Sequence, residues 1–361
     1  MISFLSKPIM RLIVIGLFSV SVSWGRLADT KEVNLVIATT HPPTLPWVSL
    51  LRDEFIPAFE KGIYALEPFT ELRWTKAWGS LYKWHDSLSA AEIGLSDIAW
   101  VGSVWESSRL PLSNVTYSLP FITDDLVTLL EVVNDLHESI PQMKEEWEKC
   151  NVKFLGATGV DTYHLLTKFP VKNFADLKGK KILAPGTARI WLRGSGAIPV
   201  NGALTTYYTQ LKTGVADGAL TILTGAYPFR LHEVAPNLTL VGLGAQSVGA
   251  LVVNLDKWKG MSAMWQLLLK ELARSYSKRS AQIAEIRASQ AMASLVTEGI
   301  SVTELGPNEK EKWMRALSPL GKNWVERNEE KGLPAKEVVG ALMRELRKRG
   351  VEPKKAWDSE L

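Results

Sequence analysis

The chain contains one cysteine, Cys150, and five histidines among 361 residues. A single thiol cannot form a disulfide within the chain, and it excludes every metal site that needs several cysteines. The histidines are scattered, and no pair has the HExxH spacing with which a helix binds zinc. Stability must therefore come from apolar cores rather than from covalent or metal cross-links.

Recognisable catalytic motifs are also missing. Ser195 lies in a Gly-Ser-Gly sequence that lacks the GxSxG spacing of a strained nucleophile turn. Gly242, Gly244 and Gly249 do not fit the GxGxxG pattern of a dinucleotide-binding loop. We therefore expect no catalytic residues, no metal and no cofactor, and the chain is not expected to be an enzyme.

Charge of one sign is nowhere concentrated. The formal net charge is +4, and lysines and arginines alternate with acidic residues. Because a nucleic-acid-binding protein gathers positive charge on one face, this pattern excludes nucleic acid as a partner. A composition of 46% hydrophobic and 22% charged residues is typical of a globular protein, and the length favours two domains.

One long apolar run stands near the N-terminus. Two basic residues precede the uncharged stretch Leu12–Gly25, which is shorter than the roughly 20 residues that cross a bilayer. With small residues at Ser23 and Gly25, it predicts a secretory signal peptide over residues 1–25, cleaved near Gly25; the alternative is an uncleaved membrane anchor. No later run is apolar enough to cross a membrane, so we expect an exported protein without membrane insertion after signal removal.

Short apolar strands alternate with helical segments, which predicts an α/β fold with parallel sheets covered by helices. Strands are expected at 32–39, 72–77, 96–101, 153–158, 164–167, 238–241 and 250–254, and helices at 47–61 and 81–94. Residues 263–298 are almost free of glycine and proline and predict one long helix. We expect a first lobe over 31–152, to which about 247–262 return, a second lobe over 153–246, and helices packing on both lobes over 263–361.

Aromatic residues are abundant, with 14 tryptophans and 8 tyrosines, and several follow predicted strands. In open α/β sheets, ligands bind beyond the carboxyl ends of the strands. Aromatic walls there exclude water and stack on flat ligands, although tryptophans also pack in cores. We expect at least two of the tryptophans near strand ends to line a pocket: Trp78, Trp84, Trp100 and Trp105.

Several short motifs occur in a characteristic order over residues 30–350. They are His41-Pro42-Pro43, Trp78-Gly79-Ser80-Leu81, Leu119-Pro120-Phe121, Asp176-Leu177-Lys178-Gly179, Tyr207-Tyr208, Gly214-Val215-Ala216-Asp217-Gly218 and Gly332-Leu333-Pro334. Together they resemble the periplasmic solute-binding proteins of TRAP transporters, of the dicarboxylate-binding-protein-like kind. The resemblance implies a two-lobe, type II-like clamshell with a long hinge-spanning helix. It also implies capture of a small-molecule solute and its delivery to TRAP-type membrane permease subunits.

The candidate ligand-binding residues combine strand-end positions with positions that match this family. They are His41, Trp78, Trp84, Trp100, Gly102, Trp105, Tyr163, Pro185, Arg189, Tyr207, Tyr208, Asp217, Thr221 and Gln246.

One position departs from the family pattern. Most relatives have an arginine where this chain has Leu183, and many have an asparagine at the position of Thr221. The usual pairing of a ligand carboxylate with that arginine is therefore ruled out. Either helix N-termini bind the anion, or the ligand is neutral or aromatic, or another cation supplies the charge, for which the candidates are Arg189, Arg193, Arg109 and Lys83.

These observations predict an extracytoplasmic receptor that captures a small organic solute for a TRAP-type transporter. An organic acid is the expected ligand, and an aromatic one is the alternative. Three other functions remain open: a sensor that presents its ligand to a membrane signalling protein, an enzyme on the same scaffold, and a receptor for an ATP-driven permease.

Overall fold

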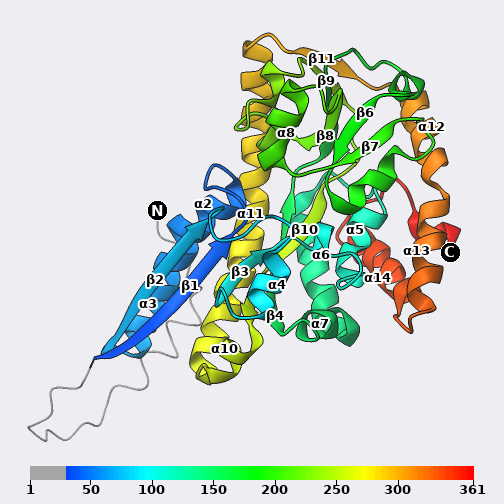
Figure 1. Cartoon of the computed structure of the whole chain (residues 1–361). Helices are drawn as coiled ribbons and strands as arrows, with labels where there is room; N and C mark the ends of the chain where they lie inside the picture. The colour runs from blue at the N-terminus through cyan, green and yellow to red at the C-terminus, as the bar shows by residue number, and fades with distance from the viewer. Residues whose placement is uncertain (1–29) are drawn as a thin grey trace, which may run out of the picture.

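The computed structural model describes residues 30–361, which form two lobes (Figure 1). The predicted signal peptide lies outside the described residues. The first lobe is built on a five-stranded sheet with the order β2 (Thr70–Trp78), β1 (Lys31–Thr39), β3 (Ile98–Val101), β10 (Gln246–Asn254) and β4 (Val152–Val160). Strand β1 is parallel to β2 and β3, whereas β10 is antiparallel to β3 and β4.

The second lobe is built on a six-stranded sheet. Its order is β11 (Ser301–Glu304), β9 (Asn237–Leu240), β5 (Tyr163–Thr167), β8 (Gly218–Ile222), β6 (Lys181–Ala184) and β7 (Ile198–Asn201). Strand β6 is parallel to β7 and β8, and β5 is antiparallel to β8 and β9. The segment between β6 and β7, expected to be an α-helix, is a 3₁₀-helix over Gly186–Leu192.

The chain enters the second lobe later than the sequence pattern indicates. The prediction starts this lobe at residue 153, but β4 pairs with β10 and belongs to the first sheet. The reason is that β4 finds its partner about ninety residues further along the chain, and its apolar pattern suits either sheet. The first crossing between lobes follows β4 at Asp161, and the chain returns through β10.

Helices cover both sheets. On the first lobe they are α2 (Pro46–Leu50), α3 (Ile56–Leu66), α4 (Ser87–Glu92), α5 (Val115–Ser118), α6 (Leu126–Ser139), α7 (Pro141–Glu148) and α10 (Leu255–Gly260); on the second they are α8 (Leu204–Lys212) and α9 (Leu223–Ala226). The helix expected at 81–94 is confined to α4, and a π-helical turn over Leu51–Phe55 joins α2 to α3. Within residues 30–361, no helix is long and apolar enough to cross a membrane.

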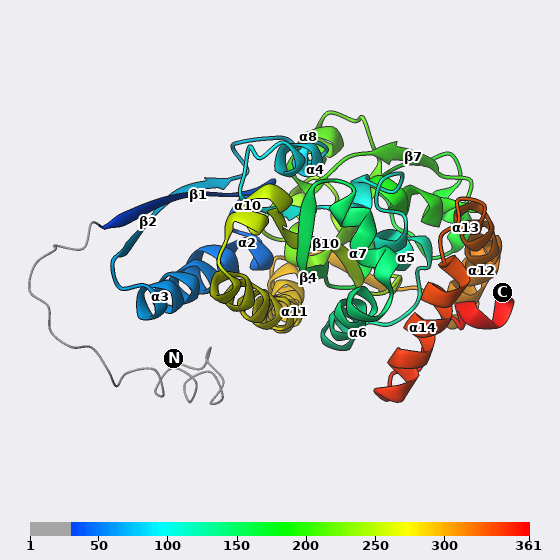
Figure 2. The same cartoon turned by 90° about the horizontal axis from the view of Figure 1, so that it is seen from below.

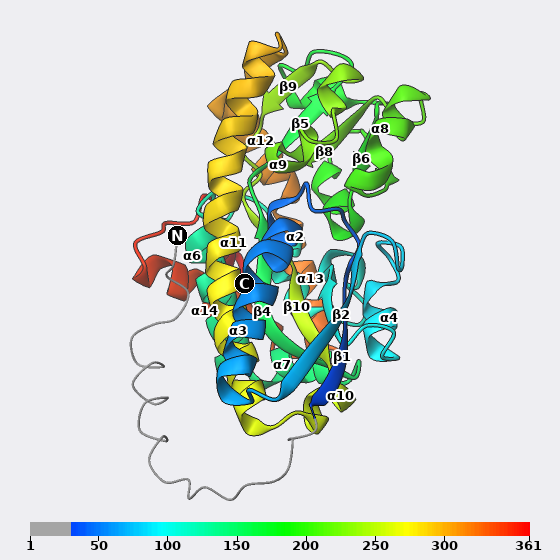
Figure 3. The ribbon, with the colours of Figure 1, turned by 90° about the vertical axis from the view of Figure 1, so that its left-hand side faces the viewer.

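Helix α11 (Ala263–Thr297) runs along both lobes, within one residue of its predicted end (Figure 3). Its N-cap is Ser262, whose side chain accepts a hydrogen bond from the backbone N–H of Trp265 at 3.3 Å. Near its start Leu272 packs in the main core, and near its end Leu295 packs in the core of the second lobe. One helix therefore supports both halves of the molecule.

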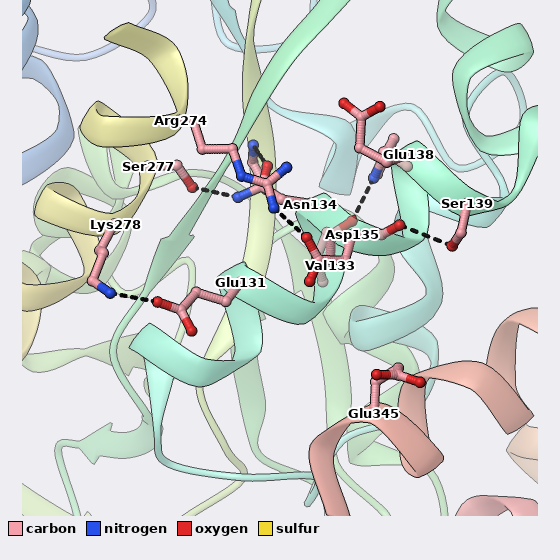
Figure 4. A network of polar contacts seen from close by, with 12 residues as sticks. Glu131, Val133, Asn134, Asp135, Glu138, Ser139, Arg274, Ser277, Lys278 and Glu345 are labelled. Carbon is pink, nitrogen blue, oxygen red and sulfur yellow. Dashed lines mark hydrogen bonds and ion pairs between the residues drawn. The ribbon is translucent and has the colours of Figure 1, made fainter. Parts of the chain in front are cut away.

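Polar contacts connect α6 to its neighbours (Figure 4). The buried amide of Asn134 donates to Ser277 Oγ on α11 at 2.9 Å and accepts from the backbone N–H of Ala157 on β4 at 2.8 Å. On the exposed side, Lys278 Nζ lies 2.7 Å from Glu131 Oε1. Exposed ion pairs stabilise a fold only slightly. The satisfied Asn134 amide therefore fixes how α6 sits against β4 and α11.

The C-terminal helices α12 (Pro307–Leu317), α13 (Pro319–Glu329) and α14 (Ala335–Lys348) lie together at one side of the molecule (Figure 2). Helix α12 packs on the second lobe, where the indole N–H of Trp313 donates to the carbonyl oxygen of Trp191 at 2.7 Å. Helix α14 packs against α6 of the first lobe. Like α11, this group contacts both lobes.

Cys150 lies two residues after the end of α7 and is buried, with 4% of its surface exposed. It packs among apolar side chains of the first lobe, including Trp147, Val152 and Val252. A thiol enclosed in this way contributes packing and does not meet reagents in solution.

Candidate functional site

A cavity lies between the two lobes, beyond the carboxyl ends of β1 and β3. In this arrangement of the lobes its volume is about 30 Å³, which is room for about two water molecules, so a larger solute needs the lobes to move apart. Its walls are His41, Trp47, Trp100, Val104, Trp105, Val160, Tyr163, Pro185, Ala203, Leu204, Tyr207, Leu220, Thr221, Ile222 and Val248. Apolar and aromatic groups from both lobes therefore enclose the space.

The turn after β1 places His41 in this wall. Thr39 Oγ1 donates to the carbonyl oxygen of His41 at 2.7 Å, and the hydroxyl of Thr40 lies 2.7 Å from His41 Nδ1. These contacts fix both the backbone and the ring. Burial lowers the pKa of His41 to about 4, so the imidazole is neutral at neutral pH.

Aromatic rings surround His41 on the first-lobe side. The ring of Trp100 meets that of His41 edge-on at 5.5 Å between centroids and stacks on Trp47 at 5.9 Å. Trp105 stacks on His41 at 6.2 Å. The indole N–H of Trp100 donates to Thr158 Oγ1 on β4 at 2.8 Å, which anchors the central ring. The result is a rigid wall suited to flat ligands.

The second-lobe side combines the start of α8 with the ends of β6 and β8. Tyr207 points from the first turns of α8, and Thr221 lies on β8. Near the crossing between lobes, the hydroxyls of Tyr163 and Tyr117 lie 2.8 Å apart and share a hydrogen bond in which either can donate. This half of the cavity therefore carries its hydroxyl groups.

Three donors around the cavity have no hydrogen-bond partner among the described residues. They are the indole N–H groups of Trp47 and Trp105 and the hydroxyl of Tyr207. Trp47 and Tyr207 are almost completely buried, with 2% and 1% of their surface exposed. Because a buried donor without a partner is unfavourable, such groups mark places where a bound molecule can supply acceptors.

The two lobes touch at the rim of the cavity. Thr187 of the second lobe donates from Oγ1 to Asn114 Oδ1 at 3.2 Å and to the carbonyl oxygen of Val104 at 3.3 Å, both in the first lobe. Gly186 lies so close to Val104 that an added Cβ would stand 2.1 Å from the same carbonyl oxygen. A residue without a side chain is thus needed where the lobes meet.

The first-lobe side of this contact is held by a buried carboxylate. Glu146 on α7 accepts hydrogen bonds from the backbone N–H groups of Leu112 at 2.9 Å and Ser113 at 2.7 Å, directly before Asn114. Burial raises the pKa of Glu146 from 4.5 to about 7. The folded protein therefore keeps a proton here that the unfolded chain loses. The effect makes the fold less stable as the pH rises from about 4.5 to about 7.

Glu146→Gln removes this titration. Relative to the unsubstituted protein, the free energy of unfolding of the variant is expected to increase by up to about 1.4 kcal/mol for each pH unit between pH 5 and pH 7. Urea unfolding at several pH values measures it. Glu145→Gln, an exposed position on the same helix, is the matched control. Parallel profiles for Glu146→Gln and the unsubstituted protein would contradict the raised pKa.

The cavity wall includes seven of the residues selected from the sequence. They are His41, Trp100, Trp105, Tyr163, Pro185, Tyr207 and Thr221. That these side chains contact a ligand stays a prediction. Their positions agree with the expectation that the pocket lies beyond strand ends.

The other selected residues lie elsewhere. Trp84 and Arg189 line a wider neighbouring groove, which shares Val104 and Trp105 with the cavity. Trp78 ends the edge strand β2, and Gly102 lies beneath Trp105. The hydroxyl of Tyr208 donates to Glu233 at 3.3 Å at the surface. Asp217 Oδ2 accepts the backbone N–H of Lys181 at 2.8 Å, so it ties the start of β8 to the start of the parallel strand β6.

Gln246 is fully buried where β10 begins. It pairs with Val160 of β4, and Val160 lines the cavity. Its side-chain amide has no hydrogen-bond partner among the described residues, although Gln246 is not itself part of the wall. It therefore lies one layer behind the cavity.

None of the candidate cations lines the cavity, and Leu183, at the position of the family's arginine, does not line it either. Leu183 is buried in the second-lobe core beside Tyr207. Arg109 pairs with Glu92 at 2.7 Å, Arg189 is exposed and donates to the carbonyl oxygen of Gly186, and Arg193 and Lys83 are exposed. Within residues 30–361, no group of three or more His, Cys, Asp or Glu side chains could hold a metal ion.

Sequence reasoning missed part of the wall. Trp47 opens α2, and the sequence pattern indicates only the start of a helix there, although this tryptophan follows a strand-end loop. Ala203 and Leu204 begin α8, and Leu220, Ile222 and Val248 are apolar strand residues. Nothing in their residue types separates them from core positions.

A ring-lined cavity between two α/β lobes, with one long helix supporting both, defines a two-lobed solute-binding protein. The model of the family described as "Bacterial extracellular solute-binding protein, family 7" matches residues 76–328, more than half of the chain. The chain belongs to this family. Its members bind solutes, so the protein is a receptor and not an enzyme, and the family is extracytoplasmic.

Individual relatives agree with this assignment. A solute-binding protein of Sulfitobacter sp. (strain NAS-14.1) is 39% identical over 103 residues, which cover 28% of this chain and 31% of that protein. The match thus spans about a third of the relative's length. Solved structures agree over nearly their whole length. A TRAP solute-binding protein of Rhodoferax ferrireducens T118, in complex with copurified benzoate, has a TM-score of 0.77 at 16% identity, covering 88% of this chain and 98% of that one.

A TRAP periplasmic solute-binding protein of Bordetella bronchiseptica, with bound (R)- and (S)-mandelate, has a TM-score of 0.75 at 22% identity. The similarity covers 88% of this chain and 99% of that one. These likenesses confirm the predicted two-lobe fold and the resemblance to TRAP solute-binding proteins.

Proposed function

We propose that the protein captures a small organic solute with a flat, largely apolar body and delivers it to a TRAP-type membrane permease. The observation that carries the proposal is the enclosure of one cavity by six rings from both lobes: His41, Trp47, Trp100, Trp105, Tyr163 and Tyr207. Benzoate and mandelate in two structural relatives support an aromatic body.

Closure of the lobes couples capture to delivery. A ligand that touches both walls binds the closed arrangement more tightly than the open one, and so shifts the population toward closure. The contacts of Thr187 with Val104 and Asn114 form only when the lobes meet. A permease that binds surfaces of both lobes then distinguishes the loaded receptor from the empty one.

The place of action follows from the same proposal. A signal peptide over residues 1–25 directs the chain to the periplasm, with cleavage near Gly25, and the mature protein meets the permease subunits there. Mass spectrometry of the N-terminus of protein recovered from periplasmic extracts tests the cleavage position. An N-terminus that still includes residues 1–25 would contradict it.

Ligand binding is tested by thermal unfolding of the mature protein against a library of aromatic acids, aromatic neutral compounds, aliphatic acids and polyols. A ligand at 100 times its Kd stabilises the fold by about 2.7 kcal/mol, so the melting temperature is expected to rise by several degrees. The largest rise is expected among aromatic compounds. A rise confined to aliphatic acids or polyols would contradict the proposed class of ligand.

Transport and sensing are separated by reconstitution. With TRAP-type permease subunits placed in proteoliposomes, uptake of the ligand is expected to depend on the receptor and on a sodium gradient. Uptake that proceeds equally well without the receptor would favour the sensor function instead.

A further inference from the structure

We infer that the cavity takes an uncharged aromatic compound whose polar group accepts hydrogen bonds, of the amide, carbonyl or phenol class, in place of an ionised carboxylate. The inference rests on the proposed function, since it takes the ring-lined cavity as the binding site. It names the charge and the polar chemistry of the ligand.

The first support is the charge of the wall. Among the described residues that line the cavity, none is a lysine, arginine, aspartate or glutamate, and the only imidazole, His41, is neutral. Two arginines that could have replaced the family's cation do not line the cavity. Arg109 pairs with Glu92, and Arg189 donates to the carbonyl oxygen of Gly186. An ionised carboxylate entering this space loses its hydration and gains no cation in return.

The second support is a buried acid behind the wall. Asp161 directly follows the wall residue Val160 and has 5% of its surface exposed. It accepts the backbone N–H of Leu223 at 2.8 Å and the hydroxyl of Thr224. Burial raises the pKa of Asp161 to about 6, so it is mostly ionised at pH 7.5. A ligand carboxylate would add a second negative charge to the same water-poor region.

The third support is the set of unpaired donors. The indole N–H groups of Trp47 and Trp105 lie on the first-lobe side, and the Tyr207 hydroxyl lies on the second. Neutral donors recognise a carbonyl, amide or phenolic oxygen without a change of charge. Because these donors come from both lobes, a ligand with an acceptor binds the closed arrangement more tightly and shifts the population toward it.

The N-terminus of α8 does not reverse this balance. Ala203 and Leu204 bring the first turn of α8 to the cavity, and a helix N-terminus carries the equivalent of about half a positive charge. Part of that capacity is used locally, since the side chain of Thr206 accepts the backbone N–H of Ala203 at 3.3 Å. Half a positive charge stabilises a buried carboxylate less than a full cation would. The negative charge of Asp161 reduces this stabilisation further.

Matched ligand pairs test the inference. Benzoate with benzamide, and mandelate with mandelamide, have nearly the same shape and differ in charge at pH 7.5. With the mature protein, calorimetric or tryptophan-fluorescence titration is expected to give the amide of each pair a Kd at least about tenfold lower.

The outcomes separate this inference from the proposed function. Carboxylates that bind as tightly as their amides, or more tightly, overturn the uncharged-ligand inference and leave the aromatic receptor standing. Failure of all four compounds and of a wider aromatic library overturns the proposed function, and the inference with it.

Tyr207→Phe tests the donor. Loss of the Tyr207 hydroxyl is expected to weaken benzamide binding about fivefold, which corresponds to one neutral hydrogen bond. The affinity for toluene, which has no acceptor, is expected to stay unchanged. Tyr208→Phe is the matched control, because that hydroxyl bonds Glu233 away from the cavity. Equal benzamide affinity in Tyr207→Phe and the unsubstituted protein would overturn the role of the Tyr207 hydroxyl.

Discussion

Replacing Gly186 with alanine is expected to weaken ligand binding at least about tenfold while each lobe stays folded. The backbone of Gly186 has φ +43°, and an added Cβ would lie 2.1 Å from the carbonyl oxygen of Val104. Gly186 belongs to the second lobe and Val104 to the first, so opening the lobes relieves the clash. The ligand then loses its contacts with one wall. Calorimetric titration with a ligand found by thermal unfolding measures the change.

Gly179→Ala is the matched control for the clash that Gly186→Ala introduces between the lobes. Gly179 also has a positive φ, +73°, but nothing lies within 4 Å of an added Cβ. Both variants carry the strain of a left-handed residue, about 1 kcal/mol, and only Gly186→Ala carries the clash between lobes. Small-angle scattering is expected to show a more open average shape for Gly186→Ala alone. Equal losses of affinity in the two variants would contradict the explanation by a clash between the lobes.

Trp100→Ala is expected to lower the free energy of unfolding by about 3–5 kcal/mol and to abolish measurable ligand binding. Trp100 is completely buried and touches the rings of Trp47, His41 and Trp105. Truncation leaves a void at the centre of the aromatic wall, and the neighbouring rings lose the surface that positions them. Urea unfolding and ligand titration measure the two effects.

Thr158→Val separates the ring of Trp100 from its hydrogen bond. Thr158 Oγ1 accepts the indole N–H at 2.8 Å, and valine keeps the volume while removing the acceptor. The cost is expected to be about 1–3 kcal/mol, with ligand binding retained. If Trp100→Ala cost no more than Thr158→Val, or still bound ligand, the aromatic wall would not be what holds the ligand.

Local patterns are sufficient to predict most elements of the fold. The glycine-free stretch from residue 263 predicts α11 because only a long helix accommodates so many residues without a break, and its observed end is Thr297. Strands such as β1 and β9 also lie within one residue of prediction. Local patterns could not predict the lobe to which β4 belongs, because its pairing with β10 depends on contacts between residues distant in sequence.

The site is predictable where a residue follows a strand. His41 and Trp100 stand at the ends of β1 and β3, and general sheet geometry places such residues at a ligand site. Val248 and Ile222 give no such signal, because apolar strand residues line cores and cavities alike. Asp217 carries a ligand-like group, but its acceptor is occupied by a backbone N–H, which only the structure reveals.

The direction of a cationic side chain is the least predictable feature. Arg189 follows β6 on what the sequence presents as a helix that could face the cavity. The segment is instead a 3₁₀-helix, and its tighter winding rotates successive side chains by about 120° rather than 100°. Arg189 consequently lies in the outer groove, where its Nε donates to the carbonyl oxygen of Gly186 at 3.1 Å.

The burial of Cys150 makes lobe closure accessible to spectroscopy. It is the only thiol of the chain, and its enclosure lets cysteines introduced at the surface react alone with thiol-specific spin labels or dyes. Ile93 on the first lobe and Ile198 on the second are 77% and 49% exposed, so Ile93→Cys with Ile198→Cys provides a pair across the lobes. The separation of the two labels then reports opening directly in solution, with the native cysteine left in place.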